Sequence, residues 1–394
     1  MSSLKILHIA DQYEGGGAES VFRDTIKISE QLNFTNKVVY SNGKTNPFSY
    51  IFSLKYFLIT IYNILKFKPD VIHLHNYYHF LSPSVLIAMK VAKLCSIKFK
   101  VIFTAHDYHL ICPNSGFQYF TETGRKNFSY KEKNISYFYM FDERSFFHSF
   151  LKKIQHFVNY KILLAQNVID VIVSPSYFLK EVFEIYGVKQ KILVIRNPID
   201  LADKINEENG NTADGYRFYE KGDSDNPIKI VFIGRVTPEK GLNKFISLLE
   251  KNTDKYYEVH IFGVGEDLSQ ITHREINTTK LTIIAHGFIP REHLPVLIRD
   301  YDLFVLPSLW VENAPISIIE AAKQGLPVLV PNYGGLKEMA ELTKYFFFFD
   351  FENGSSLPNV IDMAIKRRKQ NKILEEKIFS HELYKKKIKE IYTT

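Results

Sequence analysis

The sequence predicts an α/β protein made of two doubly wound, Rossmann-like domains, each built on a parallel sheet. Short apolar segments alternate with amphipathic segments, as expected for strands connected by helices. This alternation occurs in two series, separated by a polar stretch over 201–227 that is rich in Gly, Asn and Asp. The length of 394 residues suits two domains of ordinary size.

The first series contains a clear helix and a set of candidate strands. Over Ala18–Leu32, apolar residues recur with a helical period at Val21, Phe22, Ile26 and Ile28. The candidate strands are Leu4–Ala10, Lys37–Ser41, Asp70–His75, Lys100–Thr104, Val168–Val173 and Ile192–Arg196. Because such strands alternate with helices, we expect a parallel sheet that is covered on both faces.

The second series begins at residue 228 and ends in a basic helix over about 372–392. Its candidate strands are Ile228–Ile233, Tyr257–Phe262, Leu281–Ala285, Leu303–Leu306, Pro327–Val330 and Tyr345–Phe349. We therefore expect a first domain over 1–200, a linker over 201–227 and a second domain over 228–372. The helix at about 373–394 is expected to pack back on the first domain.

Composition excludes several classes of protein. The two cysteines, Cys95 and Cys112, lack metal-ligand spacing and fit a reducing cytosol better than a disulfide framework. A net charge of +7, without a zinc or base-stacking motif, makes nucleic acid an unexpected partner. The segment Tyr50–Phe67 is long and apolar, but Lys55 and Asn63 interrupt it. We expect a buried or membrane-surface helix there, not a spanning helix.

The loops after the strands are where ligands of doubly wound sheets bind, so their residues carry the functional prediction. After the first strand, Gly15, Gly16 and Gly17 lead into a helix. Their backbone amides can approach a ligand closely, and the helix N-terminus favours an anion. A tight turn alone also explains such glycines. The spacing is not the G-x-G-x-x-G pattern of dehydrogenases.

Histidines follow two further strands of the first domain. His106 and Asp107 come after Lys100–Thr104, where they can hydrogen-bond sugar hydroxyls and Asp107 can orient the imidazole. Asn76 and His75 follow the third strand and present a weaker case. His73 alternates into that strand, and a core histidine is the favoured interpretation.

The aromatic and basic segment 112–160 has no clean period. It is interpreted as an acceptor-binding or membrane-contacting segment, with a helical excursion packed on its own domain as the alternative.

The second domain places cations and small residues at strand ends. Gly234, Arg235 and Lys240 follow its first strand, where the two cations can neutralise a diphosphate leaving group. Gly263 and Gly265 follow the next strand and leave room for a ligand. The segment after Leu281–Ala285, which contains Phe288, is a candidate wall for a nucleobase.

The most informative pattern follows Leu303–Leu306 and contains two glutamates. Glu312 precedes a helix that is expected to end at Gly325, and Glu320 lies about a turn and a half inside it. A carboxylate among Ile318, Ile319 and two alanines needs a partner. We expect the donor to contact the free amides at the helix start. Those free amides are near Ile316 and Ser317. We assign donor binding to Asn313, Ala314, Pro315 and Ile316.

Together these motifs resemble those of the family-4 retaining glycosyltransferases, which have the GT-B fold. The shared motifs are Gly16-Gly17-Ala18-Glu19, Thr104-Ala105-His106-Asp107, Ser174-Pro175-Ser176, Asn197-Pro198-Ile199-Asp200, Gly234-Arg235 through Lys240-Gly241, Glu312 with Glu320, and Gly334-Gly335. The resemblance covers nearly the whole chain, and its specificity lies in the ordered set. It implies an active site in a cleft between the two domains.

The resemblance also implies residue roles. Arg235 and Lys240 should bind the diphosphate, Glu312 the donor sugar and Glu320 the ribose. His106 should contact the donor sugar near the reacting carbon. Gly16 and Gly17 should border the diphosphate and the acceptor, and we assign acceptor contacts to Asp107 and Asn76.

The family pattern further implies retention of anomeric configuration, no metal and no cofactor apart from the nucleotide-diphosphate sugar. UDP, GDP and other carriers would use similar phosphate and ribose contacts. Two departures stand out, Asn313 where a small residue is common and the aromatic run Phe346–Phe349. Neither removes an expected catalytic group.

The predicted function is transfer of a sugar to a glycan or lipid-linked glycan in surface polysaccharide biosynthesis. We expect a cytoplasmic location, with peripheral contact to the inner face of the membrane left open. The alternatives are a nucleotide-sugar epimerase of the same fold and a non-catalytic subunit that binds nucleotide or lipid.

Overall fold

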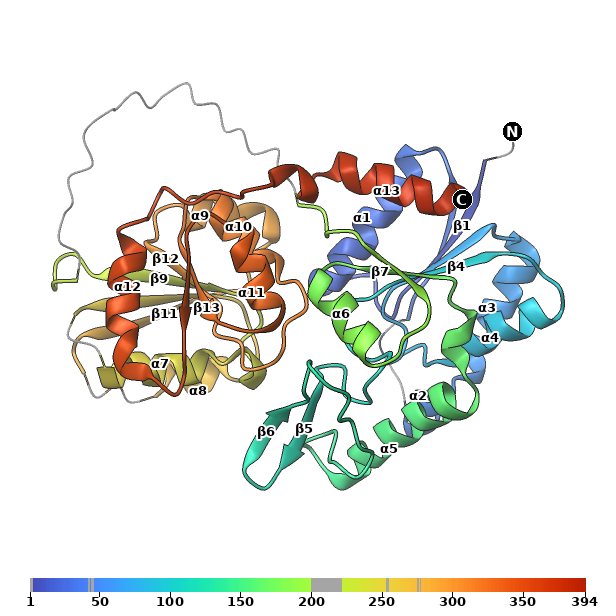
Figure 1. Ribbon diagram of the computed structural model, residues 1–394, viewed down its shortest axis with the longest axis horizontal. Helices are drawn as coiled ribbons and strands as arrows, with labels where there is room; N and C mark the ends of the chain where they lie inside the picture. The colour runs from blue at the N-terminus through green and yellow to red at the C-terminus, as the bar shows by residue number, and fades with distance from the viewer. Residues whose placement is uncertain are drawn as a thin grey trace. The chain divides into compact units, whose positions relative to one another are not determined.

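The computed structural model describes residues 3–41, 43, 46–199, 222–252, 255–274, 276 and 278–394 (Figure 1). The described chain divides into two compact units. The first comprises Met1–Pro198 together with Ile378–Thr394, and the second comprises Ile199–Lys377. Most of the predicted linker, residues 201–221, lies outside the described residues.

Within its described residues, the first unit has a six-stranded sheet in which all neighbours are parallel, in the order β2-β1-β3-β4-β7-β8. The strands are β1 (Lys5–Ile9), β2 (Thr35–Val39), β3 (Val71–Leu74), β4 (Lys100–Thr104), β7 (Val171–Ser174) and β8 (Lys191–Val194). Strand order reverses between β1 and β3, and ligands of such sheets bind beyond the carboxyl ends at that point.

The first unit's core forms between this sheet and its helices. The helices are α1 (Gly17–Gln31), α2 (Pro47–Ile51), α3 (Leu54–Phe67), α4 (Ser84–Leu94), α5 (Phe146–His156), the π-helix η1 (Phe157–Ile162), the 3₁₀ helix η2 (Ala165–Val168), α6 (Tyr177–Ile185) and α13 (His381–Thr393). Buried Ile388 of α13 packs with Ile6 and Ile102 of the sheet. The Tyr384 hydroxyl lies 2.8 Å from Thr25 Oγ1 of α1, and α13 runs beside α1 (Figure 1). The C-terminal helix therefore completes the core of the first unit.

The second unit repeats this architecture. Its described residues form a six-stranded parallel sheet in the order β11-β10-β9-β12-β13-β14. The strands are β9 (Ile228–Ile233), β10 (Tyr257–Phe262), β11 (Leu281–Gly287), β12 (Leu303–Val305), β13 (Val328–Pro331) and β14 (Phe346–Phe349). The order reverses between β9 and β12, which places the second ligand edge after these two strands. The predicted α/β fold of two parallel-sheet domains is confirmed.

Helices and short 3₁₀ turns connect the strands of the second unit. They are η3 (Pro238–Lys240), α7 (Leu242–Asn252), α8 (Leu268–Thr272), η4 (Arg291–His293), α9 (Leu294–Ile298), α10 (Ile316–Lys323), α11 (Gly334–Glu341), η5 (Gly354–Ser356), α12 (Leu357–Ile365) and η6 (Glu376–Phe379). The aromatic run in β14 is half-buried except for Phe349, which is buried and contacts Phe245 of α7 edge-on.

Several predicted boundaries were wrong. The final helix begins at His381 and not near Lys372, because the Ser380 side chain caps its N-terminus by accepting the Leu383 amide. Strand β7 begins at Val171 and not at Val168, because residues 165–168 form a 3₁₀ turn. The apolar stretch from Tyr50 is two helices, α2 and α3, separated where Ser53 caps α3. Among the described residues, the chain has no helix with the length and apolarity needed to cross a membrane.

The segment 112–160 has a structure that its sequence did not predict. It forms the antiparallel hairpin of β5 (Gln118–Thr121) and β6 (Gly124–Asn127), followed by α5. Both lie apart from the main sheet (Figure 1). Helix α5 packs on α2.

Candidate active site

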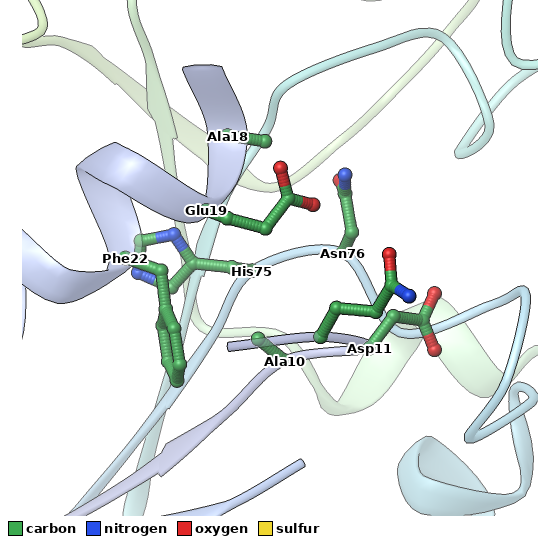
Figure 2. Close-up of a pocket in the computed structure, with 8 residues that line it drawn as sticks. Ala10, Asp11, Ala18, Glu19, Phe22, His75 and Asn76 are labelled. Carbon is green, nitrogen blue, oxygen red and sulfur yellow. The ribbon is translucent and has the colours of Figure 1, made fainter. Parts of the chain in front are cut away.

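A small hollow lies where the strand order of the first sheet reverses, beyond β1 and β3 (Figure 2). Its walls come from the end of β1, from α1 and from the loop after β3. The lining residues are Ala10, Asp11, Gln12, Ala18, Glu19, Phe22, His75 and Asn76. In Figure 2 the Glu19 carboxylate and the Asn76 amide face the same space. Predicted Asn76 thus lies at the ligand edge of the first sheet.

Asp11 organises the wall of this hollow. Its buried carboxylate accepts hydrogen bonds from the backbone amides of His79, Phe80 and Leu81, at 2.8, 2.9 and 2.9 Å. The Asp11 amide in turn donates to the Asn76 carbonyl at 2.6 Å. Burial raises the pKa of Asp11 to about 6, although the three amides act in the opposite direction. Asp11 therefore ties the loop after β3 to the loop after β1.

The predicted glycines stand at the start of α1. Gly16 precedes the helix and Gly17 begins it, and both are exposed. A Cβ atom on Gly17 would meet nothing within 4 Å. Gly16 has no side chain to cap the helix, which leaves the first amides of α1 open to a ligand.

His106 lies after β4 and pairs with a histidine from the neighbouring strand. His75 Nδ1 is 2.9 Å from His106 Nε2, and the two rings are stacked with centroids 5.2 Å apart. Burial lowers the pKa of His106 to about 4 and holds the pKa of His75 well below its usual range. Both imidazoles are therefore neutral at physiological pH.

The other polar residues near His106 are held within the domain. Asp107 accepts a hydrogen bond from the Tyr78 hydroxyl and another from the His109 amide, the latter at 2.9 Å. Burial raises the pKa of Asp107 to about 6. His73 is fully buried, with its ring nitrogens 2.6 Å from the Tyr392 hydroxyl and 2.8 Å from Thr104 Oγ1. It is the core histidine that its position in the strand indicated.

In the second unit, the edge between β9 and β12 brings predicted Lys240 and Glu312 together. Lys240 Nζ lies 2.5 Å from Glu312 Oε1, and the Ser308 hydroxyl donates to the same oxygen at 2.6 Å. Lys240 also lies over the Trp310 ring, 5.1 Å from its centroid. The Lys240 and Glu312 side chains are only 13% and 6% exposed, so solvent screens this pair weakly.

Arg235 differs from Lys240. It is exposed, and no described acidic residue forms an ion pair with it. Gly234, just before it, bonds through its amide to the Phe262 carbonyl. A Cβ atom on Gly263 would lie 1.8 Å from the Gly234 carbonyl oxygen, and one on Gly265 would lie 2.2 Å from that of Val236. Gly263 and Gly265 therefore permit close packing of the loop after β10 against the loop after β9.

The loop that carries Glu312 is held from behind by α11. The Gly335 amide donates to the Glu312 carbonyl at 2.8 Å, and a Cβ atom on Gly335 would lie 1.9 Å from the Asn313 carbonyl oxygen. Asn313 is buried, Ala314 is half-buried, and Pro315 immediately precedes α10, which begins at Ile316. The predicted donor segment is thus one continuous turn into a helix N-terminus.

Glu320 has a partner that the sequence did not reveal. The Nε of Arg291, from η4, donates to its carboxylate, and the two side chains are 35% and 17% exposed. Phe288, which precedes η4, is 70% exposed. A ribose at Glu320 would meet a carboxylate that is already oriented by a guanidinium.

No group of three or more His, Cys, Asp or Glu side chains is arranged to hold a metal ion anywhere in the described part of the chain. Three residues absent from the sequence prediction, Asp11, Ser308 and Arg291, hold predicted site residues or the loops that carry them. His75, a weaker candidate in the sequence, contacts His106. Arg291 and Glu320 are 29 positions apart in the sequence, and His75 and His106 are 31 positions apart. For Asp11, the local signal in the sequence was its position directly after the first strand.

Two family profiles match the chain. Glycosyltransferase Family 4 matches residues 29–203, and Glycosyl transferases group 1 matches residues 218–381. The fold and the two matching profiles identify a glycosyltransferase built on two parallel-sheet domains. The chain belongs to glycosyltransferase family 4, with the GT-B fold.

The relatives that the chain matches include a protein of a cps region and a galactosyltransferase. The chain is 25% identical over 83% of its length to an uncharacterized 42.6 kDa protein of the cps region of Klebsiella pneumoniae, 76% of which is covered. It is 32% identical to UDP-Gal:α-D-GlcNAc-diphosphoundecaprenol α-1,3-galactosyltransferase of Escherichia coli, over 39% of each chain. Anabaena HepE, solved in complex with UDP-glucose, superposes with a TM-score of 0.61 over 99% of both chains at 17% identity.

Proposed function

We propose that this glycosyltransferase moves one sugar from a nucleotide-diphosphate donor to a lipid-linked glycan, with retention of configuration and without an essential metal. The observation that carries the proposal is the Lys240–Glu312 pair with Ser308 at the ligand edge of the second sheet. It sets an ammonium for a diphosphate beside a carboxylate for sugar hydroxyls. The helix N-terminus at Ile316 adds free amides to the same edge.

The proposed reaction breaks the bond between the sugar's anomeric carbon and the distal phosphate oxygen. The acceptor hydroxyl forms the new bond on the same face of the sugar, and its proton passes to the departing phosphate. Lys240 and Arg235 stabilise the charge that develops on that phosphate. Neutral His106 binds the donor sugar or its phosphate by a hydrogen bond and does not take the proton, because its pKa is held near 4.

The acceptor class is inferred from the relative in Escherichia coli, whose acceptor is a GlcNAc linked to diphosphoundecaprenol. A lipid of that kind stays in the bilayer, so an enzyme that uses it has to reach the membrane surface. We therefore place this protein in the cytoplasm, in peripheral contact with the inner face of the membrane. Its segment 112–160 is the candidate for that contact.

Donor binding is tested first, by thermal unfolding with UDP, GDP, ADP, CMP and their common sugar conjugates, with EDTA present. A nucleotide that binds only the folded protein raises the melting temperature. Arg235→Ala should abolish the shift. Arg299→Ala, which removes another exposed cation of the second unit, should keep it. A shift that appears only with added divalent metal would contradict metal independence.

Transfer is then measured with the selected donor and a GlcNAc-diphosphate-lipid acceptor, and NMR of the product gives its anomeric configuration. An inverted product would refute the retaining mechanism. Conversion of the donor without any acceptor would instead indicate an epimerase.

A further inference from the structure

On helix α5 and the π-helix that continues it, several uncharged polar residues are buried whereas four phenylalanines are exposed. Inward-facing Gln155 donates to the Tyr50 and Tyr78 carbonyls at 2.5 and 2.8 Å, and Asn159 donates to the Gln155 carbonyl at 2.8 Å. Ser149 and His156 are also buried. A helix packed against a domain and facing water normally has the reverse pattern.

Together with exposed phenylalanines of the neighbouring segments, these four form a set of six, which we call the phenylalanine patch. They come from α2, from the loop before α5, from α5 itself and from η1. The members are Phe48, Phe138, Phe146, Phe147, Phe150 and Phe157, which are 86, 98, 69, 55, 46 and 47% exposed. Contacts within the first unit link them, since α2 packs on α5, Phe146 lies against Phe150, and Phe157 packs on Tyr137, next to Phe138. Such a cluster is unusual on a water-facing surface.

The charge around the patch identifies what covers it. Residues 144–169 include Arg144, Lys152, Lys153 and Lys161 but no Asp or Glu. Just before them, Asp142 is buried and is paired with Arg144 and Lys152, and Glu143 accepts from Arg125. This part of the first unit is therefore suited to an anionic surface and repels a second copy of itself.

We propose that the phenylalanine patch is a membrane-docking surface that inserts its rings at the interface of an anionic phospholipid bilayer. The inference deepens the proposed membrane contact, on which it rests, by naming the surface and the lipid class. Phenylalanine rings enter the headgroup boundary while Lys153 and Lys161 stay near lipid phosphates. Helix α5 then lies in the plane of the interface, and the rest of the first unit stays in water.

The test is flotation of the full chain with vesicles of phosphatidylcholine alone or mixed with an equal amount of phosphatidylglycerol. The protein should float with the mixed vesicles and much less with phosphatidylcholine, and added salt should weaken binding. Phe146→Ser/Phe147→Ser/Phe150→Ser should weaken binding by about tenfold or more. The control triple, Val296→Ser/Met363→Ser/Leu374→Ser, removes exposed apolar residues of the second unit and should bind normally.

Insertion is measured independently with one fluorescent reporter. Trp310 is the single tryptophan of the chain, so Phe150→Trp in a Trp310→Phe background reports only on the patch. Its emission should shift to the blue on mixed vesicles and be quenched by lipids with brominated acyl chains. The matched reporter Met363→Trp should not respond.

Three results would overturn the proposal: equal flotation of the phenylalanine triple variant, equal binding to both vesicle types, or a patch-dependent dimer in light scattering without vesicle binding. The last result would assign the patch to a protein partner. Transfer to a water-soluble acceptor analogue separates this inference from the proposed function. The triple variant should keep that activity. If the unaltered protein does not transfer the sugar either, the proposed function is refuted and the docking surface is not.

Discussion

His75 Nδ1 and His106 Nε2 are 2.9 Å apart, and both rings are neutral, so a single proton lies between them. His75 Nε2 is buried and has no hydrogen-bond partner among the described groups. A buried N–H without an acceptor is costlier than a buried lone pair without a donor. The network therefore assigns the shared proton to His75 Nδ1. His106 then carries its own proton on Nδ1.

Replacing His75 should change the tautomer of His106 and slow transfer without removing donor binding. We expect His75→Leu to lower kcat about tenfold, a loss of about 1.4 kcal/mol of transition-state stabilisation, with little change in KM. His75→Asn, whose side-chain N–H can replace Nδ1–H, should recover part of the rate. Histidine ¹⁵N chemical shifts should show protonated Nδ1 in the native His106. His8→Leu is the control for loss of a buried histidine in the same sheet.

The Lys240–Glu312 pair should behave differently in stability and in catalysis. Because the pair is largely buried, Lys240→Met or Glu312→Gln alone should destabilise the fold by about 3 kcal/mol. The double variant should recover much of that stability, since neither charge is left unpaired. Its transfer rate should stay at least as low as that of either single variant. Denaturant unfolding and kcat/KM measure the two effects, and recovery of activity in the double variant would show that the pair is only structural.

Because Arg291 contacts Glu320, nucleotide binding should depend on Arg291, which lies outside the family motifs. If Arg291 orients the carboxylate for ribose, then Arg291→Ala and Glu320→Gln should each weaken the Kd for the nucleotide diphosphate about tenfold. Calorimetry with UDP or GDP, whichever raises the melting temperature, provides the measurement. The corresponding 2′,3′-dideoxy nucleotide should bind wild type and both variants alike. If both variants lose as much affinity for the dideoxy nucleotide, Glu320 does not act by binding the ribose hydroxyls.

A methyl group on Gly335 should disrupt the loop that carries Glu312. Its Cβ would lie 1.9 Å from a backbone oxygen of Asn313, which cannot move aside as a side chain can. We expect Gly335→Ala to cost about 1–3 kcal/mol of unfolding free energy and to reduce activity strongly. Gly17→Ala, where the added methyl meets nothing within 4 Å, should leave stability unchanged. Unaltered melting of Gly335→Ala would contradict the packing described here.

Buried histidines should make the protein sensitive to mild acid. Burial lowers the pKa of His8 and of His106 to about 4 and that of His156 to about 3. Below about pH 6.5 these histidines bind protons in the unfolded chain but not in the folded chain. The free energy of unfolding therefore falls as the pH drops toward 4. Each such histidine contributes up to about 1.4 kcal/mol per pH unit in that range. Asp11 and Asp107, with pKa values raised to about 6, offset part of this loss because their folded forms bind protons more readily.

Melting temperatures at pH 7.5, 6 and 5 measure this effect. Roughly this range spans the pH at which histidines of the unfolded chain become protonated. His8→Gln should reduce the slope with pH, and His293→Gln, at an exposed position on η4, should not. Equal slopes for His8→Gln and the unaltered protein would show that His8 binds a proton as readily in the folded as in the unfolded protein.

The alternation of apolar runs was enough to predict both sheets. Strands β4, β9 and β10 have their predicted bounds, because buried parallel strands are continuous apolar segments that end at a turn. The positions of Lys240 and Glu312 followed from the rule that ligands bind beyond strand ends. The hairpin β5–β6 could not be predicted in the same way, because neither of its strands is buried on both faces.

The sequence by itself determined the two-domain α/β fold, the family and the loops that carry the site, because each depends on local periodicity or on an ordered set of short motifs. Only the tertiary structure decided which side chains meet. The partner of His106, the partner of Glu320 and the outward direction of the phenylalanines on α5 depend on contacts between segments far apart in the chain. Local sequence does not encode those distances, since they arise from the register of neighbouring strands and from the packing of helices against them.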